Sequence, residues 1–437
     1  MNGYNGDKKM KQGCEAEKNR AYAYLDGIEE RLYGFADTVR KTPELGFRER
    51  KTSAFVEERM REIGLYNVRR VALTGVAAEL FPPKEGEERV CVIGELDAVL
   101  TPDCPYADPA TGAAHTCGHN IQIAELLGVA EALKNSGVAE SLGGNVTFLA
   151  VPAEEFVDAD YREGLRAEGK IRALSGKLEL LSEGFFDGMS CAMMVHAQPN
   201  CPEPTCFVEC NSLGFVAKTV HFRGKAAHAG GAPWDGINAL NAAMAAMMCI
   251  NAMRETFRDS DKIRVHPIIT KGGDLVNIVP ADVTMETYVR GATPEAITDA
   301  AAKVDRAIRG AAYAIGAEVE IRDIGAYAPL RQDHALSALF ADNARGFLPE
   351  ERIISGVDMV GSTDMGDVSL ALPAIQPTCG GYNGGAHAAD FRVTDNRAAI
   401  LLPTKLMTAT VIDLLVNGAE RAAEIRRSFA KQHNKRG

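Results

Sequence analysis

Three short segments of the chain carry side chains suited to holding a metal ion, and the first of them is residues 115–120. This segment reads His-Thr-Cys-Gly-His-Asn, which places the thiol of Cys117 two residues before the imidazole of His119. The glycine between them lets the backbone bend, so both groups can reach one metal centre or a bridged pair of ions. A buried cysteine beside a surface histidine would give the same residues, and this segment alone favours neither interpretation.

Two adjacent carboxylates form the second segment. Glu154 and Glu155 come directly after an apolar run, residues 146–151, that is typical of a buried strand. At a strand end the two side chains project in different directions, so one can bind a metal while the other faces a metal-bound water. Paired glutamates are more often found in a solvated loop, but functional sites gather at the carboxyl edge of a sheet, which favours the metal interpretation here.

Two isolated histidines complete the set. His196 follows a short apolar run, and His387 lies in the glycine-rich third segment, residues 384–390. A single histidine is usually an ordinary polar residue, but together these segments supply five ligands, enough for two divalent ions: Cys117, His119, Glu155, His196 and His387. Glu154 is left over as a base. Water bound between divalent ions has its pKa lowered toward about 7, and Glu154 can pass the released proton to a leaving amine.

In these motifs the chain resembles the aminoacylase and carboxypeptidase metallopeptidase family. Within it, the amidohydrolase branch with hippurate hydrolase and, more closely, aminobenzoyl-glutamate hydrolase is the most similar. The metal motifs are accompanied, in the family's order and over nearly the whole chain, by matching segments at residues 43–47, 95–98, 224–230 and 361–364.

The resemblance implies a two-metal centre. Cys117 would bridge the two ions, His119 and His196 would complete one site, and Glu155 and His387 the other. Thiolate and imidazole ligands suit zinc best, while manganese, cobalt or nickel would also be accepted.

The resemblance also implies catalytic and substrate-binding residues. Glu154 would be the general base and then the general acid, and Asp97 would orient a metal ligand. His228 would stabilise the oxyanion in the active site of a neighbouring subunit, while Asn277 and Arg290 would face the substrate. A guanidinium suits a bidentate grip on a substrate carboxylate, although a strand-end arginine in a surface ion pair is an equally common arrangement.

The alternation of apolar patterns predicts an α/β fold with an inserted α+β domain. The catalytic domain, residues 1–210 and 325–437, should hold a mostly parallel sheet flanked by helices, with Asn120 capping the helix after the first metal segment. Residues 211–324 follow the β-α-β-β-α-β order of a ferredoxin-like unit. The family resemblance implies that this unit is the lid and dimerisation domain. The expected elements there are strand 215–222, helix 237–256, strands 265–271 and 284–290, helix 294–314 and strand 317–322.

The net charge and composition of the chain limit the kinds of molecule that it can bind. The 437 residues carry a formal net charge of −11, which argues against nucleic acid or an anionic membrane and favours a small, partly apolar substrate. The motifs imply that this small molecule contains an amide bond. Residues 1–11 contain no apolar core typical of a secretory signal, and the ten cysteines have no regular spacing. We therefore expect a cytoplasmic enzyme with reduced thiols. The family resemblance adds the expectation of a homodimer or of a homologous partner subunit.

Three departures from the hippurate-type pattern favour the aminobenzoyl-glutamate side of the branch: Asn120 in place of an aspartate, Ala-Gln-Pro at residues 197–199, and a charged helical insertion at residues 161–181. The predicted function is metal-dependent cleavage of the amide bond of an N-acyl or N-aminobenzoyl amino acid, or of a dipeptide-like substrate. Two alternatives remain open, a non-catalytic subunit of a hetero-oligomeric amidohydrolase and a thiol amidase with Cys117 as nucleophile.

Overall fold

The computed structural model of the protein describes residues 4–433, which form two compact units. Unit 1 contains the chain up to Asn211, Arg331–Asp358 and the chain from Asp367 onward; unit 2 contains Ser212–Leu330 and Met359–Gly366. Residues 1–3 and 434–437 lie outside the described residues. They belong to the two ends of the predicted catalytic domain, and residues 1–3 are also part of the segment 1–11 in which no secretory signal was found.

Unit 1 is organised by a six-stranded sheet in the order β1-β2-β6-β3-β7-β16. Its strands are β1 (Tyr66–Val71), β2 (Gly75–Glu79), β6 (Asn145–Val151), β3 (Arg89–Glu95), β7 (Cys191–Met193) and β16 (Ala374–Ile375). The pairings from β6 to β16 are parallel, and those of β1 with β2 and β2 with β6 are antiparallel. The central strands β3 and β6 are mostly apolar and buried, as expected for parallel strands covered on two faces. The predicted α/β fold is therefore confirmed.

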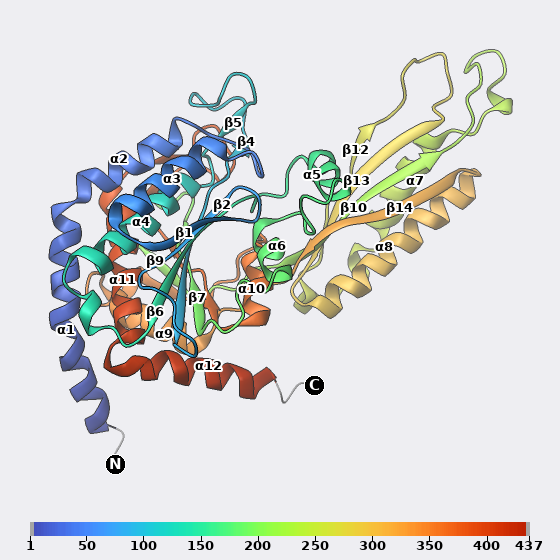
Figure 1. The fold of residues 1–437 in the computed structure, drawn as a ribbon. Helices are drawn as coiled ribbons and strands as arrows, with labels where there is room; N and C mark the ends of the chain where they lie inside the picture. The colour runs from blue at the N-terminus through green and yellow to red at the C-terminus, as the bar shows by residue number, and fades with distance from the viewer. Residues whose placement is uncertain (1–3, 434–437) are drawn as a thin grey trace. The chain divides into compact units, whose positions relative to one another are not determined.

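Helices gather along one side of this sheet (Figure 1), and α4 lies at their centre. They are α1 (Tyr4–Gly27), α2 (Glu29–Arg40), α3 (Arg50–Ile63), α4 (His119–Asn135) and α11 (Leu402–Leu415). Gly128 of α4 permits close packing, because a Cβ there would lie 2.8 Å from Cγ2 of Thr404 and 3.1 Å from Cδ2 of Leu32. Helix α4 is therefore held in place on several sides, and with it the metal-binding segment at its first turn.

The expected cap of α4 is wrong in one detail. Gly118, in the left-handed region at φ 97°, is the N-cap residue, and the helix begins at His119 rather than after Asn120. Asn120 thus lies inside the first turn, where its side-chain amide donates to the backbone carbonyl of Ala36 at 3.1 Å. The side chain joins α4 to α2 instead of capping its own helix.

Smaller elements complete unit 1. A second sheet has the order β15-β9-β17-β8, and two short hairpins pair β4 with β5 and β18 with β19. The bounds are β4 (Val99–Leu100), β5 (Ala113–Ala114), β8 (His196–Ala197), β9 (Cys206–Val208), β15 (Ile353–Ser355), β17 (Thr378–Cys379), β18 (Tyr382–Asn383), β19 (Arg392–Val393), α5 (Ala159–Ala167), α6 (Gly176–Ser182), α9 (His334–Ala344), α10 (Met365–Ala371) and α12 (Glu420–His433).

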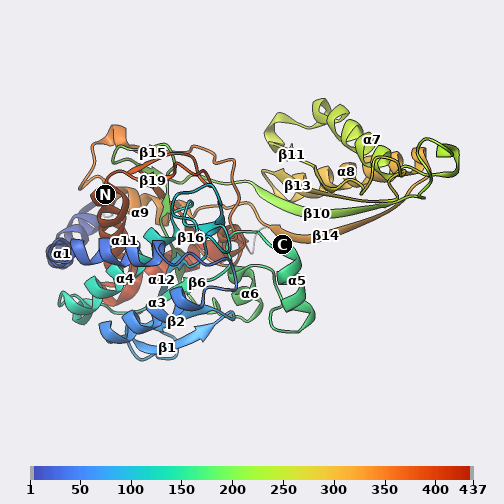
Figure 2. The ribbon, with the colours of Figure 1, turned by 90° about the horizontal axis from the view of Figure 1, so that it is seen from above.

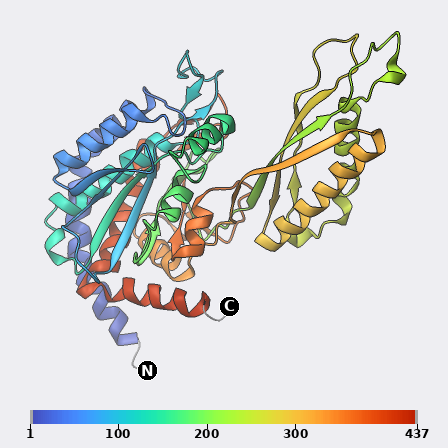
Figure 3. The same cartoon turned by 45° about the vertical axis from the view of Figure 1, so that its right-hand side comes forward.

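Unit 2 has the β-α-β-β-α-β order of a ferredoxin-like domain. Its antiparallel sheet runs β11-β13-β10-β14 with β12 paired to β13, and both helices lie on one side of it (Figures 2 and 3). The elements are β10 (Gly214–Arg223), α7 (Ala239–Ala252), β11 (Arg264–Val265), β12 (Ile268–Lys271), β13 (Asp282–Gly291), α8 (Pro294–Ile315) and β14 (Glu318–Tyr327).

All the expected elements of unit 2 are present with shifted bounds. The strands at 215–222, 284–290 and 317–322 are found as β10, β13 and β14, of which β14 runs on to Tyr327, and two other elements differ for a clear local reason. Helix α7 is shorter than expected, because the side chain of Asn238 caps it by accepting from the N–H of Asn241, and it ends at Ala252. The expected strand 265–271 is divided into β11 and β12 at Pro267, which has no N–H to donate to the sheet.

Among the described residues, the stretch Arg397–Leu415 is long and apolar enough to cross a membrane by length and hydropathy alone. Its most apolar window is 89% buried inside the protein, where it packs against the core of unit 1.

Replacement of Gly128 tests the close packing around α4. We expect Gly128→Val to lower the free energy of unfolding by about 1–3 kcal/mol, because the added methyl groups have no room beside Thr404 and Leu32. Gly34→Ala, at a helical site with open space around it, is the matched control and should raise stability by about 0.5–1 kcal/mol. Chemical denaturation of both variants measures the effect, and equal stabilities would contradict the packing described.

Candidate metal centre and active site

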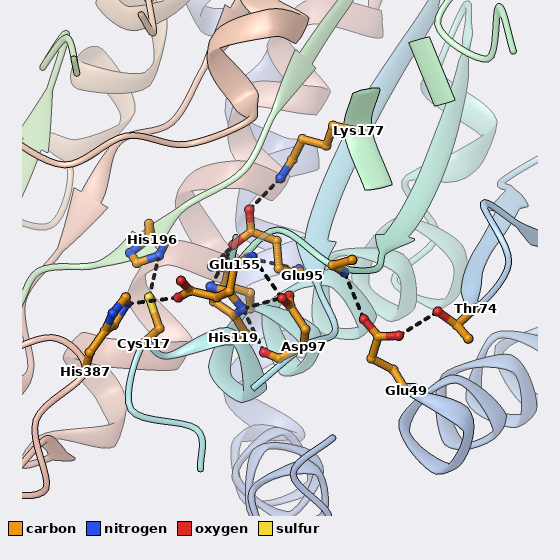
Figure 4. Close-up of polar contacts among 12 residues, drawn as sticks. Glu49, Thr74, Glu95, Asp97, Cys117, His119, Glu155, Lys177, His196 and His387 are labelled. Atoms are coloured by element: carbon orange, nitrogen blue, oxygen red, sulfur yellow. Dashed lines mark hydrogen bonds and ion pairs between the residues drawn. The ribbon is translucent and has the colours of Figure 1, made fainter. Parts of the chain in front are cut away.

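The candidate site lies where the parallel strands of unit 1 end. Strand β3 ends at Glu95 and β6 ends at Val151, so residues 95–98 and 152–155 leave the sheet at the same edge. Helix α4 brings residues 117–119 to this edge, β8 brings His196, and the loop between β18 and β19 brings His387 (Figure 4). All five predicted metal ligands are thereby brought together within unit 1.

The ligand atoms form two groups that share one thiol. Donor atoms of Cys117, His119 and His196 lie within 4.8 Å of one another, as do those of Cys117, Glu155 and His387. Sγ of Cys117 is 3.4 Å from Nε2 of His196, and Nε2 of His387 is 2.9 Å from Oε1 of Glu155. Two three-donor groups with a common sulfur suit two ions bridged by a thiolate.

A third group was not foreseen from the sequence. Carboxylate and imidazole atoms of Glu95, His119 and Glu154 also lie within 4.8 Å of one another. The available signal was the carboxylate at the end of the apolar run 90–96, because a charged side chain there must find a partner in the protein interior. Glu95 is fully buried, and its place beside His119 gives it a role in the site.

The histidine rings are oriented for metal binding by their second nitrogens. Nδ1 of His119 lies 2.8 Å from the backbone carbonyl of Asp97, and Nδ1 of His196 lies 3.0 Å from that of Ala197. With the Nδ1 proton donated to these carbonyls, Nε2 of each ring would offer its lone pair to a cation. This is the usual arrangement of metal-binding histidines.

Several buried atoms at the site lack a hydrogen-bond partner among the described residues. They are Nε2 of His119, Oε1 of Glu155 and Oδ1 of Asp97. All three have ion-pair neighbours, at 3.1, 2.9 and 3.3 Å, but without hydrogen-bond geometry. Leaving a buried polar atom unsatisfied costs about 1–3 kcal/mol. Divalent cations would satisfy the nitrogen and carboxylate donors, so the residues fit the ions that the motifs imply.

Asp97 is placed to orient two of these ligands. Its side chain is fully buried, and Oδ2 accepts from the backbone N–H of Glu155 at 2.9 Å, while Oδ1 lies 3.3 Å from Nδ1 of His119. The carboxylate thus touches the backbone of one ligand and the ring of another.

Burial and charge set the protonation of the metal-free site. Burial, reinforced by Glu155, raises the pKa of the Cys117 thiol well above its usual value. Burial alone would raise the pKa of Glu95, but Lys177 and His119 beside it lower that pKa to about 2. Without a cation Cys117 is therefore a neutral thiol, which is a poor nucleophile.

The remaining predicted residues lie in unit 2. Nδ1 of His228 accepts from the N–H groups of Gly230 and Gly231 at 3.2 and 2.8 Å, so Nε2 carries the ring proton on an exposed side chain. Asn277 is exposed, and its backbone carbonyl accepts from the N–H of Ala229. Nε2 of His228 is thus available as a donor.

Arg290 packs against two aromatic rings, Phe215 and Tyr288, that are stacked on each other. Its guanidinium carbon lies 5.3 Å from the ring centroid of Phe215 and 5.2 Å from that of Tyr288, and the guanidinium donates to the hydroxyl of Ser362. Both rings restrict its conformations, which favours a fixed cationic site over a mobile surface ion pair.

Comparison with known proteins identifies the family. The model of peptidase family M20/M25/M40 matches residues 91–412. The chain belongs to this family. Xaa-Arg dipeptidase of Mus musculus is 30% identical over 385 residues, covering 83% of this chain and 79% of that protein. One of the subunits of p-aminobenzoyl-glutamate hydrolase of Escherichia coli is 32% identical over 224 residues, 51% of this chain and 46% of that one.

Among solved structures, a dinuclear metal-binding M20 peptidase of Bacillus subtilis has the same fold. It has a TM-score of 0.67 at 20% identity, with 89% of this chain and 99% of that chain covered. Membership of the M20 family makes the chain a metal-dependent hydrolase of amide bonds, so the predicted family and the general reaction class are confirmed.

The buried Glu49 beside the site provides a test by pH. Its Oε1 accepts from the N–H of Ala153 at 2.8 Å and its Oε2 accepts from the hydroxyl of Thr74, while burial and the nearby Asp97 raise its pKa to about 8. The unfolded chain loses this proton near pH 4.3 to 4.5, about the ordinary Glu value, whereas the folded protein keeps it until about pH 8. Stability therefore falls as pH rises between these two values.

We expect Glu49→Gln to reduce this loss of stability in metal-free protein, because glutamine stays neutral throughout. Denaturant unfolding at pH 5 and pH 8 measures the difference, with Glu58→Gln at an exposed position as the control. The same pH dependence in wild type and Glu49→Gln would show that Glu49 is already ionised in the folded protein.

Proposed function

We propose that this chain binds two divalent ions and cleaves the amide bond of an N-acyl amino acid or a dipeptide-like substrate. The observation that supports this most strongly is the pair of three-donor groups that share Cys117, with Glu154 beside them. Cys117, His119 and His196 would hold one ion, and Cys117, Glu155 and His387 the other. Zinc suits the thiolate and imidazole donors best, and manganese, cobalt or nickel are the alternatives.

Glu154 is the proposed proton carrier. The bound ions would polarise the scissile carbonyl and lower the pKa of the attacking water. Glu154, buried beside His119, accepts the proton of that water and delivers it to the leaving amine. Asp97 keeps the backbone of Glu155 and the ring of His119 in position.

Unit 2 would supply the substrate-binding groups. The proton on Nε2 of His228 would be donated to the oxyanion in the site of a second subunit, and Arg290 with Asn277 would bind the substrate carboxylate. This role assigns unit 2 to dimerisation and requires a homodimer or a homologous partner. We further propose a cytoplasmic location.

The substrate class follows from the site and is narrowed by the relatives. Xaa-Arg dipeptidases match most of the chain, while the p-aminobenzoyl-glutamate hydrolase subunit matches about half of it. A panel of Xaa-Arg dipeptides and of benzoyl, aminobenzoyl, acetyl and β-alanyl conjugates, assayed with several ions, distinguishes a dipeptidase from a hydrolase of acylated amino acids. We expect substrates with a free carboxylate to be cleaved and their C-terminal amides to be poor substrates, because Arg290 then has no charged partner.

Glu154→Gln tests the proton carrier. We expect kcat to fall by about 100 to 10,000-fold while metal content stays at the wild-type value, because the amide cannot accept a proton. Steady-state kinetics and elemental analysis of the same preparation measure both. Substantial retained activity would remove Glu154 from its role.

Cys117→Ala distinguishes the metal mechanism from a thiol amidase. The metal mechanism predicts a lower metal stoichiometry, and in wild type a loss of activity with chelator that zinc or manganese restores. The raised pKa of the buried thiol supports this outcome. Activity that resists chelation but is lost on thiol alkylation would support the nucleophilic cysteine.

Mixed subunits test the shared active site. We expect His228→Ala and Glu154→Gln chains, each inactive alone, to regain part of the activity when mixed, because some sites then combine an intact His228 with an intact Glu154. Wild-type native mass, alone and with candidate partners, measures the assembly. Inactive mixtures of exchanged dimers would contradict a His228 that acts on the neighbouring subunit.

A further inference from the structure

The segment between Phe156 and Phe185, which contains the charged helical insertion, buries two cations against the candidate metal centre. Helix α5 carries Arg162 and α6 carries Lys177, and both side chains are almost completely inaccessible, at 1% and 0%. Other cations of the insertion behave differently: Arg166 and Lys170 are exposed and pair with Glu163 and Glu168 nearby in sequence. Because burying a charge is strongly unfavourable without compensation, the partners of the two buried cations indicate what the insertion does.

Lys177 contacts the site through Glu95. Its Nζ lies 2.5 Å from Oε1 of Glu95, and neither side chain has any exposed surface (Figure 4). The other oxygen of Glu95 accepts from the side-chain amide of Gln122 at 2.9 Å and lies 3.1 Å from Nε2 of His119. With one oxygen fixed by Lys177 and the other by Gln122, the carboxylate is immobile beside the ring of His119.

Arg162 contacts the site through the backbone on both sides of Glu154. Its guanidinium donates to the carbonyls of Ala153 at 3.3 Å, of Glu155, and of Leu174 at 2.7 Å. Ala153 is in the left-handed region at φ 55°, a conformation that alanine rarely adopts without support. The guanidinium therefore stabilises a strained turn that aims Glu154 and Glu155.

We propose that the insertion is a buttress of the metal centre, in which Lys177 positions His119 through Glu95 and Arg162 positions the Glu154–Glu155 turn. This inference rests on the proposed metal function. The contacts described above run from Lys177 to Glu95 and from Arg162 to backbone carbonyls, so both cations act as positioning residues. Groups that orient metal ligands in this way typically change metal affinity or activity by about 10 to 100-fold when they are removed.

Cobalt binding to the metal-free full chain tests the proposal without relying on activity. We expect Lys177→Met and Arg162→Met each to weaken Co²⁺ binding by about 10 to 100-fold and to change the visible absorption of bound cobalt, because the ligand geometry alters. Lys170→Met and Arg166→Met are the matched controls from the exposed face of the same insertion, and their affinity and spectrum should equal those of wild type.

A double variant separates positioning from folding. Lys177→Met leaves Glu95 buried without its cation and is expected to lower the thermal unfolding temperature. Adding Glu95→Gln removes the unpaired charge and should restore much of the stability, while Co²⁺ binding stays weak and the spectrum stays altered because the support of His119 is still missing. If stability and cobalt binding are restored together, Lys177 has only a structural role and the proposal is overturned.

Two further outcomes distinguish this inference from the proposed function. If wild type binds two cobalt ions and the folded Lys177→Met and Arg162→Met variants bind them with the same affinity and spectrum, the buttress is refuted while the metal centre stands. If wild type binds no cobalt, the metal centre itself is refuted, and the inference that rests on it is refuted too.

Discussion

The candidate site depends on the burial of a single thiol between two groups of polar donors. Cys117 belongs to both three-donor groups. Its sulfur is the one donor that the two groups have in common. In the metal-free protein this arrangement is unfavourable, because carboxylates next to a buried sulfur keep it protonated and several lone pairs lack partners. Cations compensate all of these costs together, which is why the chemistry of the residues and the family agree on a metal centre.

The surrounding fold keeps these groups in place. Parallel strands β3 and β6 deliver two acidic segments to one edge, and α4 packs closely against α2 and α11 around Gly128. Buried partners then fix the details: Asp97 holds the backbone of Glu155, Glu49 accepts from Ala153, and Lys177 holds Glu95. Glu49, Asp97 and Glu95 are thus each held by a specific contact, which pre-organises this edge of the sheet.

Much of this arrangement could be predicted from the sequence, because it follows from local patterns. The apolar runs at residues 90–96 and 145–151 predict buried strands, and motif spacing indicates which of the nine histidines could serve as ligands. The predicted start of α4 is wrong because Gly118, in a left-handed conformation, is the N-cap residue. Asn120 therefore lies inside the first turn of the helix. Pro267 interrupts a run that is otherwise typical of one strand.

The contacts of the insertion could not be predicted, since they join residues far apart in the chain. Lys177 and Glu95 are 82 positions apart, and in a charged segment a lysine normally faces solvent. The difference between buried Lys177 and exposed Lys170 arises only when the helices pack against the sheet edge.

Anomalous diffraction from zinc-loaded crystals tests the shared thiolate most directly. We predict two metal peaks in each subunit, both within about 2.3 Å of Sγ of Cys117, with His119 and His196 on one ion and Glu155 and His387 on the other. A single peak, or a second peak without Cys117 as its ligand, would contradict the bridging role of this sulfur.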